Sequence, residues 1–377
     1  MHNNGKPLRV LQVFSRMDIG GAETMVMNLF RKLERDKICF DFAVNVEQTC
    51  AYDAEIKELG GNIYRLPKLK NGNIHAYKSA WREFLKQHPY PIVHGHLRST
   101  AALYLPEAKR SGAVAIAHSH SISAGEGFSA LAKNILQYPI RFQADYLCAC
   151  SRAAGLWLYG KNAVNKANFR IMPNAIDTPA YRINQAARSK LRGELGIAEN
   201  TLLIGHVGRF SFPKNHTYLL DIFNEIHNMQ PDSKLILAGA GELLDETKAK
   251  AARLGLTDSV IFAGLRKDIP LLMQAMDVLV FPSRYEGLPV TLVEAQAADL
   301  PCIISDVISS EVCFSPLVQR LSLQAAPAEW AAAAIQAAKS TLRAQHVGFA
   351  SVLSNGYDVS EAAAKLQEFY FSVLLSR

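Results

Sequence analysis

The hydrophobic and polar positions of this 377-residue chain follow two alternating patterns. Short apolar runs are typical of buried strands, and longer segments with apolar residues every three or four positions are typical of amphipathic helices. LRVLQVF (8–14) is such a run, and GGAETMVMNLFRKL (20–33) is the helical segment that follows it. Alternation of this kind predicts a parallel sheet with helices on both faces.

The alternation continues along the first half and restarts once. Its further strand candidates are FDFAVN, GNIYRL, PIVHGH, VAIAHSH and ADYLCACS. A turn-rich segment, FRIMPNAIDTPAY (169–181), then interrupts the pattern. Strand candidates return with TLLIGHVGRF (201–210) and continue through SKLILAGAG, SVIFAG, DVLVFPS and PCIISD.

This organisation predicts an α/β protein of two doubly wound, Rossmann-like domains that face a central cleft. We expect residues 1–172 to form the first domain and residues 173–357 to form the second. The last segment, 358–377, is predicted to be an amphipathic helix with a serine cap that packs back on the first domain.

Composition adds limits to this picture. The chain has no apolar run of about 18 residues, so we expect no transmembrane helix. Its N-terminus runs straight into a strand and has no secretory pattern. The six cysteines form no CxxC pair, which favours reduced, mostly buried thiols in a cytoplasmic protein.

The net charge of +7 is concentrated in the first half. Residues 1–180 contain 23 Lys and Arg against 14 Asp and Glu, a balance of +9, and the remainder contains 18 against 20, a balance of −2. A basic face attracts anionic lipid or a phosphorylated ligand. Nucleic acid is disfavoured because no basic motif with interleaved aromatic residues is present.

Ligands of open α/β sheets bind beyond the carboxyl ends of the strands, so the loops there are the candidate site. Gly20 and Gly21 follow the first strand and open a helix, where backbone can approach an anion. Arg209 and Lys214 lie in the loop after the first strand of the second domain. Two cations at a strand end suit a diphosphate, although a solvated surface pair is the alternative.

Two glutamates frame the start of a predicted helix in RYEGLPVTLVEAQA (284–297). Pro289 suits the first helical position, which would leave amides near Gly287 and Leu288 open to a ligand. Glu286 and Glu294 could then bind hydroxyl groups at the two ends of a nucleotide-sugar, since carboxylates accept such hydrogen bonds. The alternative is a capping glutamate and a surface glutamate.

Glycines and histidines occupy several other strand ends. Gly239, Gly241 and Gly264 permit tight turns, and the main chain of Leu265 could read a nucleobase. Two HxH steps place His94 and His96 at one strand end, and His118 and His120 at another. No carboxylate neighbours them in sequence, so we expect hydrogen bonding to a substrate hydroxyl and no metal site.

Six motifs in this order resemble the retaining nucleotide-sugar glycosyltransferases of family 4, which have the GT-B fold. They are GGAE (20–23), HSH (118–120), PNAID (173–177), VGRFSFPKNH (207–216), LAGAGE (237–242) and EGLPVTLVEA (286–295). The resemblance spans nearly the whole chain. Within the family, the sequence is similar to enzymes of bacterial capsule, exopolysaccharide and lipopolysaccharide synthesis.

The resemblance implies a role for each candidate residue. Glu286 would contact the transferred sugar, Glu294 would hold the ribose, and Arg209 and Lys214 would clamp the diphosphate. His120 would be the histidine of the cleft, with His118 as the other possible alignment. Further donor contacts would come from Gly20, Gly21, Gly208, Gly241, Leu265 and the segment Gly287, Leu288, Pro289 and Val290.

The implied reaction is retaining transfer of a sugar from a UDP-sugar, with GDP as the other possible nucleotide, to a glycan or lipid-linked glycan. No cofactor or metal is expected, and the absence of a DxD motif agrees with this. The basic first domain would bind acceptor and could contact the inner face of the plasma membrane. The alternatives are a sugar-nucleotide epimerase of the same architecture and a non-catalytic sugar-nucleotide-binding subunit.

Overall fold

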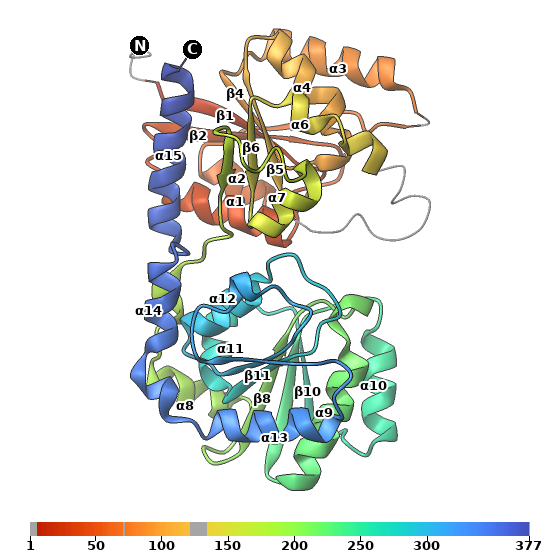
Figure 1. Cartoon of the computed structure of the whole chain (residues 1–377), viewed down its shortest axis with the longest axis vertical. Helices are drawn as coiled ribbons and strands as arrows, with labels where there is room; N and C mark the ends of the chain where they lie inside the picture. The colour runs from red at the N-terminus through yellow and green to blue at the C-terminus, as the bar shows by residue number, and fades with distance from the viewer. Residues whose placement is uncertain (1–5, 71, 121–133, 377) are drawn as a thin grey trace. The chain divides into compact units, whose positions relative to one another are not determined.

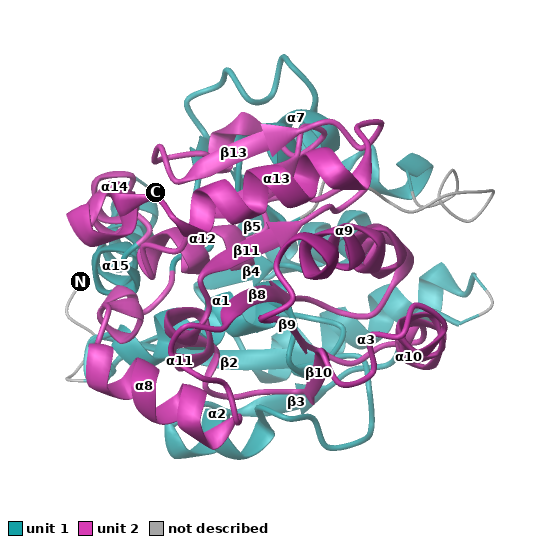
Figure 2. Cartoon of the chain, turned by 90° about the horizontal axis from the view of Figure 1, so that it is seen from below, with its two compact units in different colours: residues 1–175, 358–377 teal, residues 176–357 magenta. Residues whose placement is uncertain are grey.

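The computed structural model describes residues 6–70, 72–120 and 134–376. The chain divides into two compact units, which Figure 2 colours separately. Unit 1 comprises residues 1–175 and 358–377, and unit 2 comprises residues 176–357.

Unit 1 contains a seven-stranded parallel sheet with the order β3-β2-β1-β4-β5-β6-β7. Chain order reverses between β1 and β4, which places the topological switch point of the sheet there. The strands are β1 (Leu8–Val13), β2 (Ile38–Val44), β3 (Ile63–Arg65), β4 (Ile92–Gly95), β5 (Val114–Ser119), β6 (Tyr146–Ala149) and β7 (Phe169–Ile171).

Helices pack against this sheet because their apolar stripes must be buried. Those of unit 1 are α1 (Gly21–Lys32), α2 (Asp53–Glu58), α3 (Ile74–Gln87), α4 (Ala101–Arg110), α6 (Ile140–Gln143), α7 (Arg152–Tyr159), α15 (Val359–Leu375) and the 3₁₀ turn η1 (Arg98–Thr100). Within this unit, Figure 1 shows α1 and α3 against the sheet and α15 beside α1.

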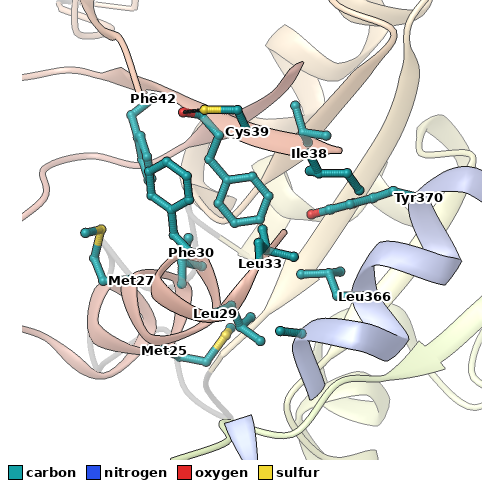
Figure 3. Close-up of a cluster of buried hydrophobic side chains, with 14 of the residues drawn as sticks. Met25, Met27, Leu29, Phe30, Leu33, Ile38, Cys39, Phe42, Leu366 and Tyr370 are labelled. Carbon is teal, nitrogen blue, oxygen red and sulfur yellow. Dashed lines mark hydrogen bonds between the residues drawn. The ribbon is translucent and has the colours of Figure 1, made fainter. Parts of the chain in front are cut away.

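The C-terminal helix α15 is part of the core of unit 1. Leu366 and Tyr370 lie among the aromatic side chains that α1 and β2 contribute, as Figure 3 shows. The predicted serine cap of this helix is wrong. Asp358 is the N-cap, and its Oδ1 accepts hydrogen bonds from the amides of Ser360 (2.9 Å) and Glu361 (3.2 Å).

Unit 2 repeats the architecture with six parallel strands in the order β10-β9-β8-β11-β12-β13. Its switch point lies between β8 and β11. The strands are β8 (Leu202–Val207), β9 (Ser233–Ala238), β10 (Val260–Gly264), β11 (Val278–Phe281), β12 (Cys302–Ser305) and β13 (Val318–Leu321).

Around this second sheet lie seven helices and four 3₁₀ turns. The helices are α8 (Gln185–Glu194), α9 (His216–Met229), α10 (Leu244–Arg253), α11 (Ile269–Ala275), α12 (Val290–Ala297), α13 (Pro327–Ala338) and α14 (Val347–Ser354). The turns are η2 (Thr178–Tyr181), η3 (Phe212–Lys214), η4 (Ser310–Val312) and η5 (Thr341–Gln345). The predicted α/β class with two doubly wound sheets is confirmed.

Two edge strands, β7 and β13, were not among the strand candidates. Each is short and has no fully buried residue, so its sequence lacks the apolar run that marks a central strand. The six cysteines are free thiols, and five of them are buried. Among the described residues, no helix combines the length and apolar character that a bilayer span requires.

Candidate functional site

An ion pair joins the loops that follow β8 and β11, at the switch point of the unit 2 sheet. Lys214 Nζ lies 2.7 Å from Glu286 Oε1, and the two side chains are only 17% and 14% exposed. The ammonium also lies 4.5 Å from the centre of the Phe281 ring, the last residue of β11. A cation is therefore held, largely desolvated, where α/β sheets bind ligands.

The two loops are fixed to each other by polar contacts at their bases. Asn215 has a left-handed backbone conformation (φ 56°), and its Nδ2 donates to the carbonyl of Pro282 at 3.1 Å. Arg284 donates from Nη2 to Asn215 Oδ1 at 2.9 Å and from its amide to the carbonyl of Pro213 at 2.7 Å. These bonds set the geometry of the Lys214–Glu286 pair.

Glycines allow the neighbouring loops to approach closely. A Cβ on Gly208 would lie 3.2 Å from Lys214 Cδ, so the lysine stem passes directly over this residue. A Cβ on Gly239 would lie 2.0 Å from the carbonyl oxygen of Gly208, and one on Gly241 would lie 2.3 Å from that of Phe210. Larger side chains at 239 and 241 would displace the β8 loop.

Helix α12 begins at Val290, and Pro289 is its N-cap in an extended conformation (ψ 107°). The predicted position of Pro289 as first helical residue is therefore wrong by one. Within the described chain, no side chain caps this helix, so its first amides remain available to an acceptor. Leu288 and Pro289 are buried beside this helix start.

The second glutamate, Glu294, faces a tyrosine from the 3₁₀ turn η2. The hydroxyl of Tyr181 donates to Glu294 Oε1 at 2.6 Å. Burial raises the pKa of Glu294, and the tyrosine hydroxyl partly opposes this shift. Burial also raises the pKa of Tyr181, with the adjacent Glu294 carboxylate acting in the same direction.

Arg209 and Leu265 are both exposed, in the loops after β8 and β10. Within the described part of the chain, no hydrogen bond or ion pair involves the Arg209 guanidinium. Leu265 is 75% exposed and directly follows Gly264, whose carbonyl accepts from the amide of Gly239 at 2.8 Å. Backbone hydrogen bonds thus link the loops after β8, β9 and β10 to one another.

In unit 1 the glycine pair lies at the start of α1, as predicted. Gly20 is the N-cap and Gly21 the first helical residue. A Cβ on Gly20 would lie 2.5 Å from Glu23 Oε2, so this carboxylate folds back over the helix start. Burial raises the pKa of Glu23. An anion that binds here must compete with this carboxylate or displace it.

The four histidines at the carboxyl ends of β4 and β5 form one stacked cluster, next to the switch point of the unit 1 sheet. His118 and His120 stack with ring centroids 4.1 Å apart, and His94 and His96 stack at 4.4 Å. His96 Nδ1 lies 2.8 Å from His120 Nε2, and His118 Nδ1 lies 3.2 Å from His94 Nε2. The two HxH segments thus contact each other directly through their imidazole rings.

Burial keeps these imidazoles neutral. Desolvation lowers the pKa of His94 and of His120 to about 3, and it lowers the pKa of His96 and of His118 well below its usual value. Arg98 lowers the pKa of His120 further, and the Asn174 side chain partly opposes the shift. Nitrogen atoms of His94, His96 and His118 lie within 4.8 Å of one another, but hydrogen bonds already occupy both nitrogens of the first two.

Comparisons with known proteins decide the family. A model described as "Glycosyltransferase Family 4" matches residues 19–179, and one described as "Glycosyl transferases group 1" matches residues 187–346. Over 373 residues, the chain is 37% identical to "Putative glycosyltransferase EpsF" of Bacillus subtilis, and the match covers 97% of each chain. The chain belongs to glycosyltransferase family 4.

Further relatives of this family 4 glycosyltransferase have more specific names. It is 27% identical to the Escherichia coli "UDP-Gal:alpha-D-GlcNAc-diphosphoundecaprenol alpha-1,3-galactosyltransferase" over 60% of each chain. Anabaena Alr3699/HepE, solved in complex with UDP, has a TM-score of 0.80 at 19% identity, over 97% of this chain and 100% of that one. This likeness shows the shared GT-B fold.

The structure brings some of the predicted site residues of this glycosyltransferase together. Lys214 pairs with Glu286, Gly208 lies beneath Lys214, and Gly241 packs on the β8 loop. Within the described residues, Arg209 and Glu294 make no hydrogen bond or ion pair with Lys214 or Glu286, although Arg209 shares the loop of Lys214 and Glu294 lies in the helix that follows Glu286. Gly20, Gly21, His118 and His120 belong to unit 1. Their roles toward a ligand stay predictions.

Several polar partners of the family 4 site were missed by sequence reasoning. They are Glu23, Tyr181, Asn215, Gln12 and Tyr370. Glu23 and Asn215 stand inside the GGAE and VGRFSFPKNH motifs, so a closer reading of those motifs could have found them. Tyr181 and Tyr370 lie 113 and 276 residues from the side chains they contact, and no local pattern indicates such pairs.

Proposed function

We propose that this family 4 glycosyltransferase transfers a sugar from a UDP-sugar to a glycan or lipid-linked glycan, with retention of anomeric configuration, in surface polysaccharide synthesis. The observation that carries the proposal is the Lys214–Glu286 pair beside the open start of α12. The names of the relatives support it. HepE was crystallised with UDP and with UDP-glucose, and the E. coli relative is named for a diphosphoundecaprenol substrate.

In this proposal the donor diphosphate binds beside Lys214 and Arg209. Cleavage of the sugar–phosphate bond builds negative charge on the diphosphate and positive charge at the anomeric carbon. The ammonium, the guanidinium and the first amides of α12 are fixed donors for that negative charge. When the donor phosphate replaces Glu286 as the partner of Lys214, the Glu286 carboxylate can accept hydrogen bonds from sugar hydroxyls.

Retention is best explained by attack of the acceptor on the same face as the leaving group. The acceptor hydroxyl forms the new glycosidic bond as the sugar–phosphate bond breaks, and a departing phosphate oxygen takes its proton. Glu294, held by Tyr181, is the proposed ribose ligand. We propose that no metal is required, because protein cations supply the charge that a metal would supply. Unchanged turnover in excess EDTA is the expected result.

A donor panel tests the proposal. The protein is incubated with UDP- and GDP-sugars, and nucleotide release and sugar identity are followed. Release of UDP with transfer to water or acceptor, and an α-linked product from an α-linked donor, is the expected result. Isomerised donor would instead support an epimerase, and saturable binding without turnover would support a non-catalytic binding subunit.

We also propose that the protein contacts anionic membrane through unit 1. Three exposed apolar side chains, Ile135, Tyr138 and Phe142, recur at helical spacing and are 67%, 56% and 68% exposed. Arg141 stacks on Tyr138 with 4.2 Å between its guanidinium carbon and the ring centre. Aromatic and aliphatic groups beside a cation are the pattern of peripheral membrane contact. A lipid-linked acceptor would be reached from such a surface.

A further inference from the structure

The histidine cluster of unit 1 has partners on two distant elements. Gln12, on β1, lies 2.9 Å through Oε1 from His96 Nε2. Its Nε2 donates to the hydroxyl of Tyr370 on α15 at 3.1 Å, and that hydroxyl lies 2.7 Å from His94 Nδ1. Gln12, His94 and Tyr370 are all buried, so water does not compete for the hydrogen bonds of this network.

On the branch from Gln12 to His96 and His120, the proton positions follow from the chemistry of the Gln12 carboxamide. A carboxamide oxygen only accepts, so His96 must carry its proton on Nε2. In a neutral ring the other nitrogen, Nδ1, is then an acceptor, and His120 must donate to it from Nε2. The remaining nitrogen of His120, Nδ1, is therefore a bare lone pair. It is buried and makes no hydrogen bond of normal geometry to the described residues, and the Asn174 side chain lies beside the ring.

The other branch runs from Gln12 through the Tyr370 hydroxyl to His94 and His118. The Tyr370 hydroxyl accepts from Gln12, and His94 Nδ1 is the acceptor that satisfies its buried proton. His94 then carries its proton on Nε2 and donates to His118 Nδ1. It follows that His118 is protonated at Nε2, and this buried N–H has no hydrogen-bond partner among the residues that the structure describes.

We propose that Gln12 and Tyr370 are positioning residues that fix the tautomers of this cluster. Its free edge then presents one donor, His118 Nε2–H, and one acceptor, His120 Nδ1. A neutral hydroxyl accepts from the first and donates to the second, so the edge is suited to an alcohol of a sugar. The Asn174 side chain lies beside His120 on the same unit, and its Oδ1 is buried.

The identification of the alcohol as a sugar rests on the proposed function, whereas the tautomer assignment does not. The assignment is tested on the full chain, labelled with ¹⁵N-histidine, by long-range ¹H–¹⁵N spectra at pH 7, with signals assigned through single histidine variants. We expect all four rings to be neutral and protonated at Nε2. A His118 or His120 protonated at Nδ1 overturns the proposal.

Tyr370→Phe tests the role of α15. The variant removes the donor to His94, so His94 and His118 should populate both tautomers, while His96 and His120 keep theirs through Gln12. Tyr77→Phe is the control, because it removes another buried hydroxyl of unit 1, bonded to Thr100 at 2.9 Å. Unchanged His94 and His118 spectra in Tyr370→Phe would overturn the proposal. If this variant does not fold, the wild-type spectrum decides.

An activity measurement separates the tautomer assignment from the proposed function. Once a donor and acceptor are known, Tyr370→Phe should lower kcat/KM by about tenfold, as expected for one misdirected hydrogen bond, without changing the Kd for UDP. Failure to find any transfer reaction would remove the proposed function and leave the tautomer result intact. Equal kcat/KM in wild type and variant would overturn the positioning role.

Discussion

At the scale of single residues, the candidate site is defined by groups that have partners before any ligand binds. Lys214 forms an ion pair with Glu286, Glu294 accepts a hydrogen bond from the Tyr181 hydroxyl, and Glu23 covers the start of α1. Each of these contacts keeps a poorly solvated charge satisfied in the free protein. A phosphorylated donor must therefore exchange partners at each position, and Lys214 is where this exchange matters most for bond cleavage.

Replacement of Lys214 by alanine tests this role. We expect Lys214→Ala to reduce the transfer rate by roughly 10²–10³-fold, because one fixed cation no longer meets the leaving diphosphate. The matched control is Lys250→Ala. Lys250 is equally buried (16% exposed) and pairs with Asp221 at 2.6 Å on the same unit. Steady-state rates and thermal unfolding of both variants are compared. Near-normal turnover in Lys214→Ala would reject the clamp.

The buried histidines predict a pH dependence of stability. The pKa of His94 and of His120 is about 3 in the folded state and about 6.5 in the unfolded chain. Between these values the unfolded chain binds more protons, so the free energy of unfolding decreases as pH falls. Each histidine contributes about 1.4 kcal/mol per pH unit over that window. Above about pH 7 both histidines are neutral in the folded and the unfolded state, so their contribution to the free energy of unfolding no longer changes with pH.

Urea unfolding at pH 5, 6 and 7, followed by circular dichroism, measures this slope. His120→Asn removes one titrating group and should reduce the slope by about one proton. A free energy of unfolding that does not change between pH 5 and pH 7 would contradict the assignment of neutral, buried imidazoles.

The sequence was informative about these residues where the chemistry is local. Arg209, Lys214 and Glu286 stand at strand ends, and strand ends can be read from apolar runs. It was uninformative about the tyrosines. Tyr370 and Tyr181 meet their partners only because a helix or a turn far along the chain packs against the sheet, and burial of an aromatic ring gives no sign of where its hydroxyl points.

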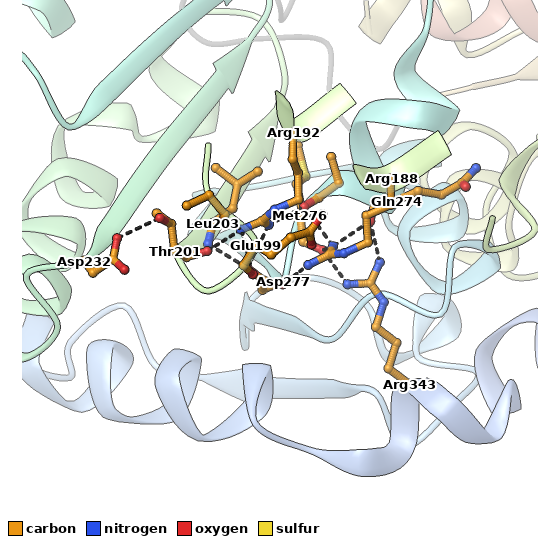
Figure 4. A network of polar contacts seen from close by, with 12 residues as sticks. Arg188, Arg192, Glu199, Thr201, Leu203, Asp232, Gln274, Met276, Asp277 and Arg343 are labelled. Carbon is orange, nitrogen blue, oxygen red and sulfur yellow. Dashed lines mark hydrogen bonds and ion pairs between the residues drawn. The ribbon is translucent and has the colours of Figure 1, made fainter. Parts of the chain in front are cut away.

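At the scale of elements, unit 2 depends on an arginine network that links α8, α11 and β11 (Figure 4). Arg188 and Arg192 both bind Asp277, at 2.5 and 3.3 Å, and both donate to carbonyls at the end of α11. Arg343 joins them through the carbonyl of Met276, and burial lowers its pKa to about 10. The guanidinium groups thus satisfy the last carbonyls of a helix that has no glycine cap.

Asp277→Asn should therefore destabilise unit 2 by roughly 3 kcal/mol, because it leaves buried guanidinium groups without their counter-charge. Glu194→Gln is the control. It removes a surface pair, Lys190–Glu194, whose side chains are 79% and 58% exposed, and should change stability by less than about 0.5 kcal/mol. Urea unfolding compares the two. If Asp277→Asn lowers the free energy of unfolding no more than the control does, the arginine network is not needed for the stability of unit 2.

Elements with a strong pattern were predictable, and weakly patterned ones were not. Central strands such as β1 and β8 are buried on both faces and read as apolar runs. The edge strands β7 and β13 alternate poorly because water reaches them, and the start of α12 differs by one residue because Pro289 fits both positions. The cap of α15 was assigned to Ser360 although Asp358, two residues earlier, makes the bonds.

At the scale of the whole molecule, charge and apolar surface gather in the same unit. The excess of positive charge lies in residues 1–180, which contain the whole of the larger segment of unit 1 (1–175). Ile135, Tyr138 and Phe142 are exposed on that unit. The charge asymmetry was visible in the sequence. The apolar group was not, because the same residues at helical spacing would equally well describe a buried face.

Membrane association is the prediction that follows from this coincidence. The protein should sediment with vesicles containing phosphatidylglycerol at low salt and be released at about 0.5 M NaCl, since the attraction of a basic surface is screened within a Debye length. Replacing Ile135 and Phe142 together by serine should weaken binding by at least about tenfold, because their apolar surface no longer enters the interface. Met229→Ser, at a 50% exposed position of unit 2, is the matched control and should bind as wild type does. Absence of vesicle binding at low salt would reject the membrane proposal. If the double variant binds vesicles as well as wild type does, the contact lies on another part of the surface.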